Sequence, residues 1–355
     1  MYIGIDTFMI YDLIILGGGP GGVAAGVYAA RKRLKTLVIA KEIGGQSIVS
    51  DNIQNWIGTV SIPGPKLQKS LKEHLLAYAD DVLTLKEKEW INKLEKSGDG
   101  FAVTTDKDRY ESKAVLITTG SSRKKLTAKG AKEFENKGVV YCASCDGPLF
   151  ADMDVVVVGG GNAGFETAAQ LLAYCKSVTL LEYGNAFKAD KITVDKVTAN
   201  PKMKALLNVE IKEIKGEKFV NGITYQDKNS GETKELSVSG VFVEIGAIPG
   251  TEYVKGLVEV DKIGQVVVNP RNQRARLLTP PEIASDARRG ESDTRSVGES
   301  TMSAAPRLRN EADEVISGGV WAAGDCTDGL YHQNNIAMGD AVKALEDIYM
   351  WLTQK

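Results

Sequence analysis

Residues 11–22 read YDLIILGGGPGG, an apolar run that ends in a cluster of glycines. A short continuous apolar run of this kind is typical of a parallel β-strand that is buried on both faces. The glycines fit the pattern G-x-G-x-x-G, and the alanine-rich segment after them predicts a helix from about Val23 to Lys32. A second apolar run, Thr36 to Ala40, would complete a strand–helix–strand unit.

This unit predicts a binding site for a dinucleotide. Glycines let the backbone approach a pyrophosphate, whose charge is stabilised by the amino end of the helix. Glu42 lies about 20 residues after the last glycine, where an acid that binds a ribose hydroxyl is expected. The glycine pattern alone is weak evidence, but strand, helix, strand and acid in this order make it specific.

The same arrangement occurs a second time. Residues 154–158 form another apolar run, and the glycine pattern of residues 159–164 again opens a helix, which is expected to reach about Cys175. Residues 177–181 are the next expected strand, and Glu182 ends it as a second candidate ribose-binding acid. Two such units imply two dinucleotides, and the natural pair is a tightly held flavin with an exchangeable nicotinamide.

Between the two units lies the segment VYCASCDG, residues 140–147. Cys142 and Cys145 are separated by two residues, so they can close a small disulfide and carry two electrons as a dithiol. C-x-x-C pairs also occur in metal sites, but zinc normally needs two more Cys or His ligands. The two histidines, His74 and His332, lie far off in the sequence, so we predict a redox pair and no metal.

Composition limits the expected partners and compartment. The chain has 355 residues, with 44 Lys+Arg against 46 Asp+Glu and a net charge of −2. This balance gives no reason to expect nucleic acid or an anionic membrane as a partner. We find no apolar run of membrane-spanning length and no signal-peptide pattern, and four cysteines are too few for a disulfide-stapled secreted fold. We therefore predict a cytoplasmic protein.

Residues 273–317 differ in composition from the rest of the chain. They contain seven arginines and no lysine, with many Ser, Glu and Ala and few large apolar residues. A polar tract of this length without periodicity is usually a surface insertion or disordered. We predict a disordered insertion, with a regulatory or docking role as the alternative.

Both glycine patterns, the Cys-Ala-Ser-Cys-Asp-Gly segment at 142–147 and the Ala-Ala-Gly-Asp segment at 322–325 support a family resemblance. The chain resembles the low-molecular-weight thioredoxin reductases. It is equally similar to the flavoprotein subunit of bacterial alkyl hydroperoxide reductase, without that protein's N-terminal thioredoxin-like extension. The resemblance implies an α/β fold of two Rossmann-like dinucleotide-binding domains, with a nicotinamide domain (124–246) inserted into a discontinuous FAD domain (1–123 and 247–355).

The resemblance also implies which residues hold the cofactors. Gln46 and Asn55 would lie near the ribityl chain and the flavin, although loop residues of this type could equally satisfy their own loops. The implied FAD residues are Gly17, Gly19, Pro20, Gly22, Glu42, Gln46, Asn55, Asp325, His332, Gln333 and Asn334. The implied nicotinamide residues are Gly159, Gly161, Asn162, Ala163, Gly164 and Glu182.

For the redox pair, the resemblance implies that Cys145 is the thiol nearest the flavin and that Cys142 attacks the disulfide of the partner. Asp146 would exchange protons with the dithiol. The residues alone do not assign these roles, because Asp146 by itself is more typical of a helix N-terminal charge than of a catalyst. Cys175 and Cys326 are expected to be packing residues.

One departure from the family pattern concerns the electron donor. Where NADPH-dependent thioredoxin reductases carry a His-Arg-Arg-like segment, this chain has Glu182-Tyr183-Gly184 with no arginine near. A carboxylate accepts a hydrogen bond from a ribose 2′-hydroxyl and repels a 2′-phosphate, so we predict NADH over NADPH. Some family members take electrons from another donor, such as ferredoxin, which is the alternative.

We therefore predict an FAD-dependent disulfide reductase, and the resemblance implies a homodimer. Electrons would pass from NADH through FAD and the Cys142/Cys145 disulfide to thioredoxin or a thioredoxin-like protein. A hinge is expected at the connections near residues 123 and 246–250. The alternatives are the reductase of a peroxiredoxin system, a dithiol oxidase and a non-enzymatic flavin redox sensor.

Overall fold

The computed structural model describes residues 10–50, 53–278 and 318–354, and the chain divides into two compact units. The first unit is built from both ends of the chain: the residues up to Val49, Trp56–Ser122 and those from Pro249 onward. The second unit contains Ser50–Asn55 and Arg123–Ile248. The expected boundaries lay after residues 123 and 246, with residues 50–55 in the first domain.

The first unit contains a seven-stranded sheet with the order β3-β2-β1-β6-β5-β4, in which β17 also pairs with β6. All pairings among β1, β2, β3, β6 and β17 are parallel, and β4 and β5 continue the sheet as antiparallel strands. The bounds are β1 (Ile10–Leu16), β2 (Thr36–Ala40), β3 (Leu83–Glu87), β4 (Ile91–Ser97), β5 (Gly100–Thr105), β6 (Arg109–Ile117) and β17 (Val320–Ala322). The continuous apolar runs therefore form parallel strands, as the sequence predicts.

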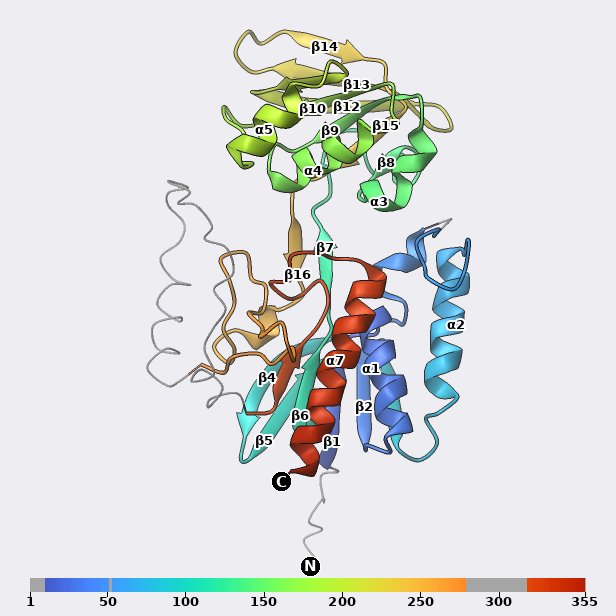
Figure 1. The fold of residues 1–355 in the computed structure, drawn as a ribbon, viewed down its shortest axis with the longest axis vertical. Coiled ribbons are helices and arrows are strands. Elements are labelled where there is room, and N and C mark those ends of the chain that lie inside the picture. Colours follow the sequence, from blue (N-terminus) through green and yellow to red (C-terminus); the bar gives the residue numbers. More distant parts are fainter. Residues whose placement is uncertain (1–9, 51–52, 279–317, 355) are drawn as a thin grey trace, which may run out of the picture. The chain divides into compact units, whose positions relative to one another are not determined.

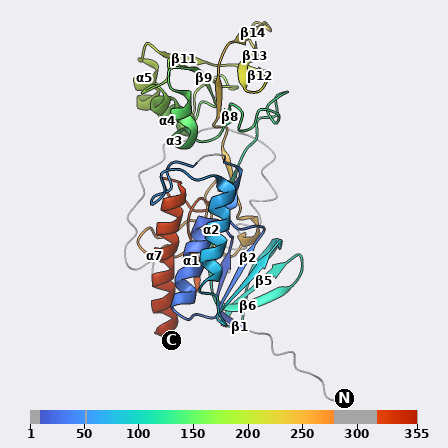
Figure 2. The same cartoon turned by 90° about the vertical axis from the view of Figure 1, so that its right-hand side faces the viewer.

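Three helices cover one face of this sheet: α1 (Pro20–Arg31), α2 (Gly64–Leu76) and α7 (Asn334–Thr353) (Figures 1 and 2). Helix α1 contacts both α2 and α7. The segment from η3 (Glu252–Val254) to residue 278 packs into the core of the opposite face. Helix α1 begins at Pro20, earlier than expected, because proline at a helix start loses no hydrogen bond and already has a helical φ.

The second unit contains a five-stranded parallel sheet with the order β11-β10-β9-β15-β8. Helices α3, α4 and α5 pack on one face, and a three-stranded antiparallel sheet, β12-β13-β14, packs on the other. The strands are β8 (Val139–Val140), β9 (Asp154–Val158), β10 (Ser177–Leu181), β11 (Met203–Leu206), β12 (Val209–Gly216), β13 (Val220–Asp227), β14 (Thr233–Leu236) and β15 (Gly240–Val243). The helices are α3 (Ala143–Asp146), η2 (Gly147–Phe150), α4 (Asn162–Leu171) and α5 (Lys191–Thr198).

The two connections between the units pair with each other. Strands β7 (Ser121–Arg123) and β16 (Ala247–Pro249) form a two-stranded sheet. The N–H of Lys124 donates to the carbonyl of Gly246 at 3.0 Å, and the N–H of Gly250 donates to the carbonyl of Gly120 at 2.9 Å. The predicted crossings are therefore one paired ribbon rather than two independent linkers.

Residues 273–278, which were predicted to belong to the insertion, are part of the core of the first unit. Gln273 is only 4% exposed and Ala275 is fully buried. The N–H of Ala275 donates to the carbonyl of Val320 at 3.0 Å, so this segment lies beside β17 in the core of the first unit. Composition alone did not predict this pairing, because Arg274 and Arg276 are of a residue type that is usually exposed. Residues 279–317 lie outside the described residues.

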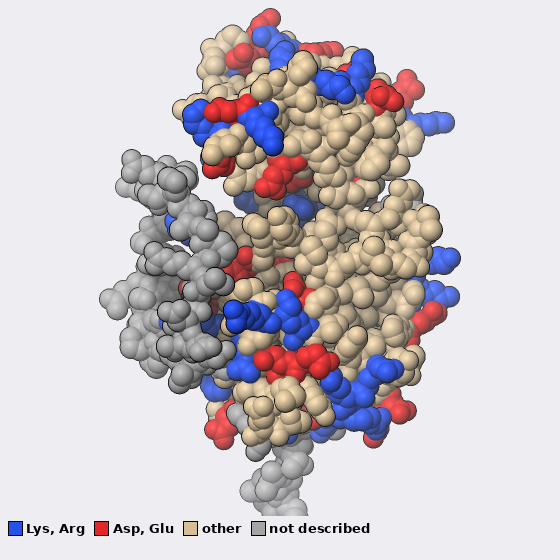
Figure 3. Space-filling model, viewed as in Figure 1, with Lys and Arg blue, Asp and Glu red and all other residues tan. Residues whose placement is uncertain are grey.

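Two further observations concern the length of the helices and the charge of the surface in the described part of the chain. No helix among the described residues is long and apolar enough to span a membrane. On the face shown in Figure 3, Lys and Arg side chains are interspersed with Asp and Glu, in keeping with the net charge of −2.

Asp347 of α7 holds the segment 273–278 in place, since its carboxylate pairs with Arg274 and accepts the indole N–H of Trp321 at 2.8 Å. We expect Asp347→Ala to lower the free energy of unfolding by about 2 kcal/mol, because the buried indole and the guanidinium lose their acceptor. Glu252→Ala removes an exposed pair with Lys255 and should cost less than about 1 kcal/mol. If a urea titration gave both variants the same loss in the free energy of unfolding, this role of Asp347 would be contradicted.

Candidate functional site

The first glycine loop connects β1 to α1 in a conformation that excludes a side chain at Gly17 and at Gly22. Gly17 has a φ of +118°, and a Cβ on Gly22 would lie 1.9 Å from the carbonyl oxygen of Gly17. Helix α1 has no side-chain cap and no acid in its first turn, so its positive amino end is not compensated by a side chain. A Cβ on Gly19 would meet nothing within 4 Å, which leaves space for a ligand beside the helix end.

Segments that are far apart in the sequence surround this loop. Atoms of Glu42, η1 (Gly45–Val49) and α7 are close neighbours of its glycines, since the relevant Cβ positions lie within 3.2 Å of them. Gly324, just before Asp325, lies against Ala337 of α7. The fold thus brings together the turns that carry these predicted FAD residues: Glu42, Gln46, Asp325 and Asn334.

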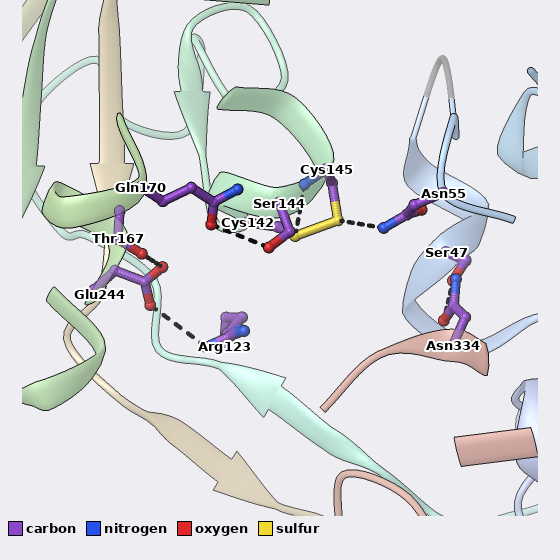
Figure 4. Close-up of a disulfide and its surroundings, with 10 residues drawn as sticks. All are labelled: Ser47, Asn55, Arg123, Cys142, Ser144, Cys145, Thr167, Gln170, Glu244 and Asn334. Carbon is purple, nitrogen blue, oxygen red and sulfur yellow. Dashed lines mark hydrogen bonds and ion pairs between the residues drawn. A yellow bond between two sulfur atoms is a disulfide. The ribbon is translucent and has the colours of Figure 1, made fainter. Parts of the chain in front are cut away.

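Several polar groups in these turns have no hydrogen-bond partner among the residues that the structure describes. The Nε2 of His332 is buried and has no hydrogen-bond partner among the described residues. The carboxylates of Glu42 and Asp325 likewise make no hydrogen bond to a residue that the structure describes. By contrast, Gln46 donates to the carbonyl of Ser121, and Ser47 donates to Asn334 Oδ1 at 3.0 Å (Figure 4). One buried polar atom and two half-buried carboxylates that the described residues leave unpaired beside a glycine loop fit a polar cofactor such as FAD.

The second glycine loop repeats the geometry of the first. Gly159 has a φ of +117°, and a Cβ on Gly164 would lie 1.9 Å from the carbonyl oxygen of Gly159. Helix α4 also begins without a side-chain cap or an acid in its first turn, and a Cβ on Gly161 would meet nothing within 4 Å. Asn162 accepts the N–H of Asp190 at 2.8 Å, while Ala163 is exposed. This helix end can therefore also receive a pyrophosphate.

Glu182 follows β10 and closes the turn beside the second loop. Its Oε2 accepts the N–H of Gly160 at 2.6 Å, and its Oε1 accepts the N–H of Gly184 at 2.7 Å. Each carboxylate oxygen has two lone pairs, so both can still accept a hydrogen bond from a ribose hydroxyl. Two backbone N–H groups thus fix the orientation of the carboxylate, and its contact with a ribose stays a prediction.

Cys142 and Cys145 form a disulfide at the start of α3, with their Cα atoms 5.3 Å apart (Figure 4). The Sγ of Cys142 accepts the N–H of Cys145 at 3.1 Å. The same N–H would stabilise negative charge on Cys142 after reduction, which fits the attacking role. Asn55 Nδ2 lies 3.8 Å from Cys145 Sγ, and both residues belong to the second unit. The predicted contact of Asn55 with the flavin stays a prediction.

Asp146 is the acid next to this disulfide. Burial raises the pKa of its carboxyl from 3.8 to about 6. A carboxyl with this pKa changes protonation close to neutral pH, as a group that exchanges protons with a dithiol must. Ser144, between the cysteines, donates to Gln170 Oε1 at 3.1 Å and ties α3 to α4 (Figure 4).

The other two cysteines are packing residues, as expected. Cys175 and Cys326 are buried and free. Their thiols donate to backbone carbonyls at 3.3 Å and 3.4 Å respectively, and burial raises the pKa of each thiol to about 11. Such thiols are largely protonated at neutral pH and are therefore unreactive.

The sequence analysis missed two charged residues of the second unit. Glu244 follows β15 and is 9% exposed, accepting the hydroxyl of Thr167 at 2.9 Å with Arg123 Nη1 at 3.5 Å (Figure 4). Burial raises the pKa of Glu244. Lys228 follows β13 in the sequence. Its Nζ reaches the turn after β10, where it donates to the carbonyl of Tyr183 at 3.2 Å. No sequence pattern marks either residue, because both reach their neighbours only through tertiary contacts.

Comparison with curated proteins gives two kinds of relatives. An NADH dehydrogenase of Bacillus subtilis (strain 168) is 36% identical over 335 residues, which is 94% of this chain and 57% of that protein. An alkyl hydroperoxide reductase subunit of Staphylococcus epidermidis is 38% identical over 263 residues, which is 74% of this chain and 51% of that protein. The chain therefore spans about half the length of these relatives.

Comparison with solved structures covers almost the whole chain. A thioredoxin reductase from Streptococcus pyogenes MGAS5005 matches with a TM-score of 0.80 and 29% identity, over 98% of this chain and 99% of that one. A thioredoxin reductase from Giardia duodenalis matches with a TM-score of 0.81 and 27% identity, over 97% and 99%.

The family model described as pyridine nucleotide-disulphide oxidoreductase matches residues 11–276. This match includes both glycine loops and the disulfide, and the expected α/β fold with two Rossmann-like domains is confirmed. The chain therefore belongs to the pyridine nucleotide-disulphide oxidoreductase family and has the fold of the thioredoxin reductases.

Proposed function

We propose that this protein is an FAD-dependent NADH:disulfide oxidoreductase that reduces the disulfide of thioredoxin or a similar protein. The observation that carries the proposal is the Cys142–Cys145 disulfide, which lies in the same unit as the second glycine loop of a family that uses FAD and NAD(P)H. The names of the relatives, an NADH dehydrogenase and a component of an alkyl hydroperoxide reductase, support NADH as the donor and a peroxide-related pathway as one context.

In this proposal the first unit holds FAD. Its pyrophosphate would lie at the amino end of α1, with Glu42 at the adenosine ribose and Asp325 at the ribityl chain. The Nε2 of His332, which has no hydrogen-bond partner in the described part of the chain, would face the flavin together with Gln333 and Asn334. When bound, FAD would supply the two-electron exchange between the nicotinamide and the disulfide.

The second unit would hold the nicotinamide dinucleotide on α4. Gly161 leaves room for the pyrophosphate, whereas Gly159 and Gly164 allow the close approach of backbone segments. Asn162 and Ala163 form the first turn of the helix. Glu182 would orient the ribose through its 2′-hydroxyl. The backbone N–H groups of Gly160 and Gly184 hold that carboxylate in place, so the ribose contact needs no side-chain rearrangement.

The reduced pair would act by thiol–disulfide exchange. The thiolate of Cys142 attacks the partner's disulfide, which forms a mixed disulfide and releases one partner thiolate. Cys145 then attacks the Cys142 sulfur, which releases the second partner thiolate and restores the disulfide. The partner gains two electrons and, after protonation, two hydrogens. Asp146 can hold and donate a proton in this step because its pKa lies near 6.

A second candidate function is the reductase of a peroxiredoxin system. The specific observation in its favour is the 38% identity to the alkyl hydroperoxide reductase component of Staphylococcus epidermidis. Steady-state turnover with a purified thioredoxin and a purified peroxiredoxin would separate the two. We also propose that the protein is a cytoplasmic homodimer. If neither NADH nor NADPH reduces the flavin, ferredoxin is the expected electron donor.

The glycine loop yields a test of FAD binding. We expect Gly22→Ala to be isolated without flavin, because its Cβ would meet the carbonyl of Gly17 at 1.9 Å. Gly19→Ala should fold but bind FAD at least about tenfold more weakly, because its Cβ enters only the ligand space. Gly339→Ala, in α7 and also without neighbours within 4 Å, is the control and should keep its flavin. Full flavin absorbance in Gly22→Ala would refute the site.

The donor preference is tested by the rate of flavin reduction under anaerobic conditions. We expect NADH to exceed NADPH by at least about tenfold in apparent second-order rate, because the Glu182 carboxylate repels a 2′-phosphate. Glu182→Gln should narrow this ratio, since it keeps a hydrogen-bonding group and removes the charge. A faster reaction with NADPH in the unaltered protein would overturn the preference.

The redox pair and its acid are tested together. We expect Cys142→Ser and Cys145→Ser to abolish disulfide reduction while NADH still reduces the flavin. Because the pKa of Asp146 is about 6, its carboxyl is a proton donor below that pH. The ratio of the wild-type rate to the Asp146→Asn rate should therefore fall as the pH rises through about 6. Ser144→Ala is the control, and a pH-independent ratio would remove Asp146 from the proton transfer.

A further inference from the structure

The turn after β10 is the part of the second unit that would read the coenzyme's ribose. In a strand–helix–strand dinucleotide site, the residue at the end of the second strand contacts the ribose 2′ position. Here that residue is Glu182, and both of its oxygens already accept backbone N–H groups, at 2.6 Å and 2.7 Å. The adjacent Tyr183 is 61% exposed.

A cation also lies at this turn, and it comes from a distant part of the sequence. Lys228 follows β13 in the hairpin that joins β13 to β14. Its Nζ lies 3.5 Å from the centroid of the Tyr183 ring and donates to the Tyr183 carbonyl at 3.2 Å. The ammonium group therefore contacts the residue that directly follows the ribose-reading carboxylate.

Backbone hydrogen bonds fix this placement. The N–H of Lys228 donates to the carbonyl of Asn208 at 2.8 Å, and the N–H of Asn208 donates to the carbonyl of Gly184 at 2.9 Å. The hairpin is thus joined through Asn208 to the turn that contains Glu182. The fold of the second unit therefore fixes the backbone of Lys228 near this turn, and only the end of its side chain can move freely.

The charge of Lys228 is not neutralised by an acid in the described part of the chain. Within residues 10–50, 53–278 and 318–354 it forms no salt bridge, whereas Lys234 of the same hairpin pairs with Glu232 at 3.1 Å. An ammonium without an acidic partner remains available for a phosphate, with which it forms a charge-assisted hydrogen bond.

We infer that Lys228 is a coenzyme-discriminating residue that binds the 2′-phosphate of NADPH, so that the protein uses NADPH as a second donor while Glu182 maintains the preference for NADH. This inference rests on the proposed nicotinamide site of the second unit. The arginines that the turn lacks are replaced by one lysine from the neighbouring hairpin. The other reading is that Lys228 only covers the Tyr183 ring and its carbonyl, in which case a 2′-phosphate makes no difference.

The test compares two coenzyme fragments in the full-length flavin-containing protein by calorimetry. The probes are 2′,5′-ADP, which carries the 2′-phosphate, and 5′-AMP, which lacks it. We expect Lys228→Gln to weaken the binding of 2′,5′-ADP at least about tenfold, because one charge-assisted hydrogen bond is lost. The binding of 5′-AMP should weaken less than about twofold. Lys228→Arg should restore most of the affinity for 2′,5′-ADP. Flavin reduction by NADPH should slow by the same factor as binding, with NADH unaffected.

Lys234→Gln is the matched control, because it removes a cation of the same hairpin that is already paired with an acid. Equal weakening of 2′,5′-ADP by both variants would indicate a general field effect and would overturn the inference. Unchanged binding in Lys228→Gln would also overturn it while leaving the proposed function intact. Failure of the unaltered protein to bind either fragment would instead refute the nicotinamide site itself, and the inference with it.

Discussion

A glycine Cα packed against a carbonyl oxygen five residues earlier is the contact on which both units depend. In each glycine loop, a Cβ on the last glycine would lie 1.9 Å from the carbonyl oxygen of the first, at Gly22 and Gly17 and again at Gly164 and Gly159. Only this close approach lets the helix start directly at the end of the strand. The uncompensated amino end of the helix then faces the space beside the sheet, where a pyrophosphate can bind.

Carboxyl groups of this protein behave differently because their surroundings differ. Glu182 accepts two backbone N–H groups, which fix the orientation of its carboxylate beside the second glycine loop. Asp146 is half-buried beside the disulfide, and this burial raises its pKa to about 6. In the proposed function, the first acid would bind a ribose hydroxyl and the second would exchange protons with the dithiol.

Local patterns were reliable where the structure depends on neighbours along the chain. The continuous apolar runs became parallel strands, the glycine loops adopted one geometry twice, and Cys142 and Cys145 closed a disulfide. The failures came where composition was used in place of contacts. Residues 273–278 read as part of an insertion, yet Ala275 pairs with Val320 in the core. Arginine is usually a surface residue, but here the fold places Asp347 beside Arg274, so the arginine pairs with an acid next to the core.

The sequence by itself determined the order of strands, helices and glycine loops, the position of the redox pair between them, and the family. These follow from spacing along the chain, which backbone geometry translates directly into structure. Only the tertiary structure decided which distant groups meet: Asn55 with Cys145, Glu244 with Thr167 and Arg123, and Lys228 with Tyr183. Such pairs depend on how strands are ordered in a sheet and on how one sheet packs on another, and neither leaves a periodic signal in the sequence.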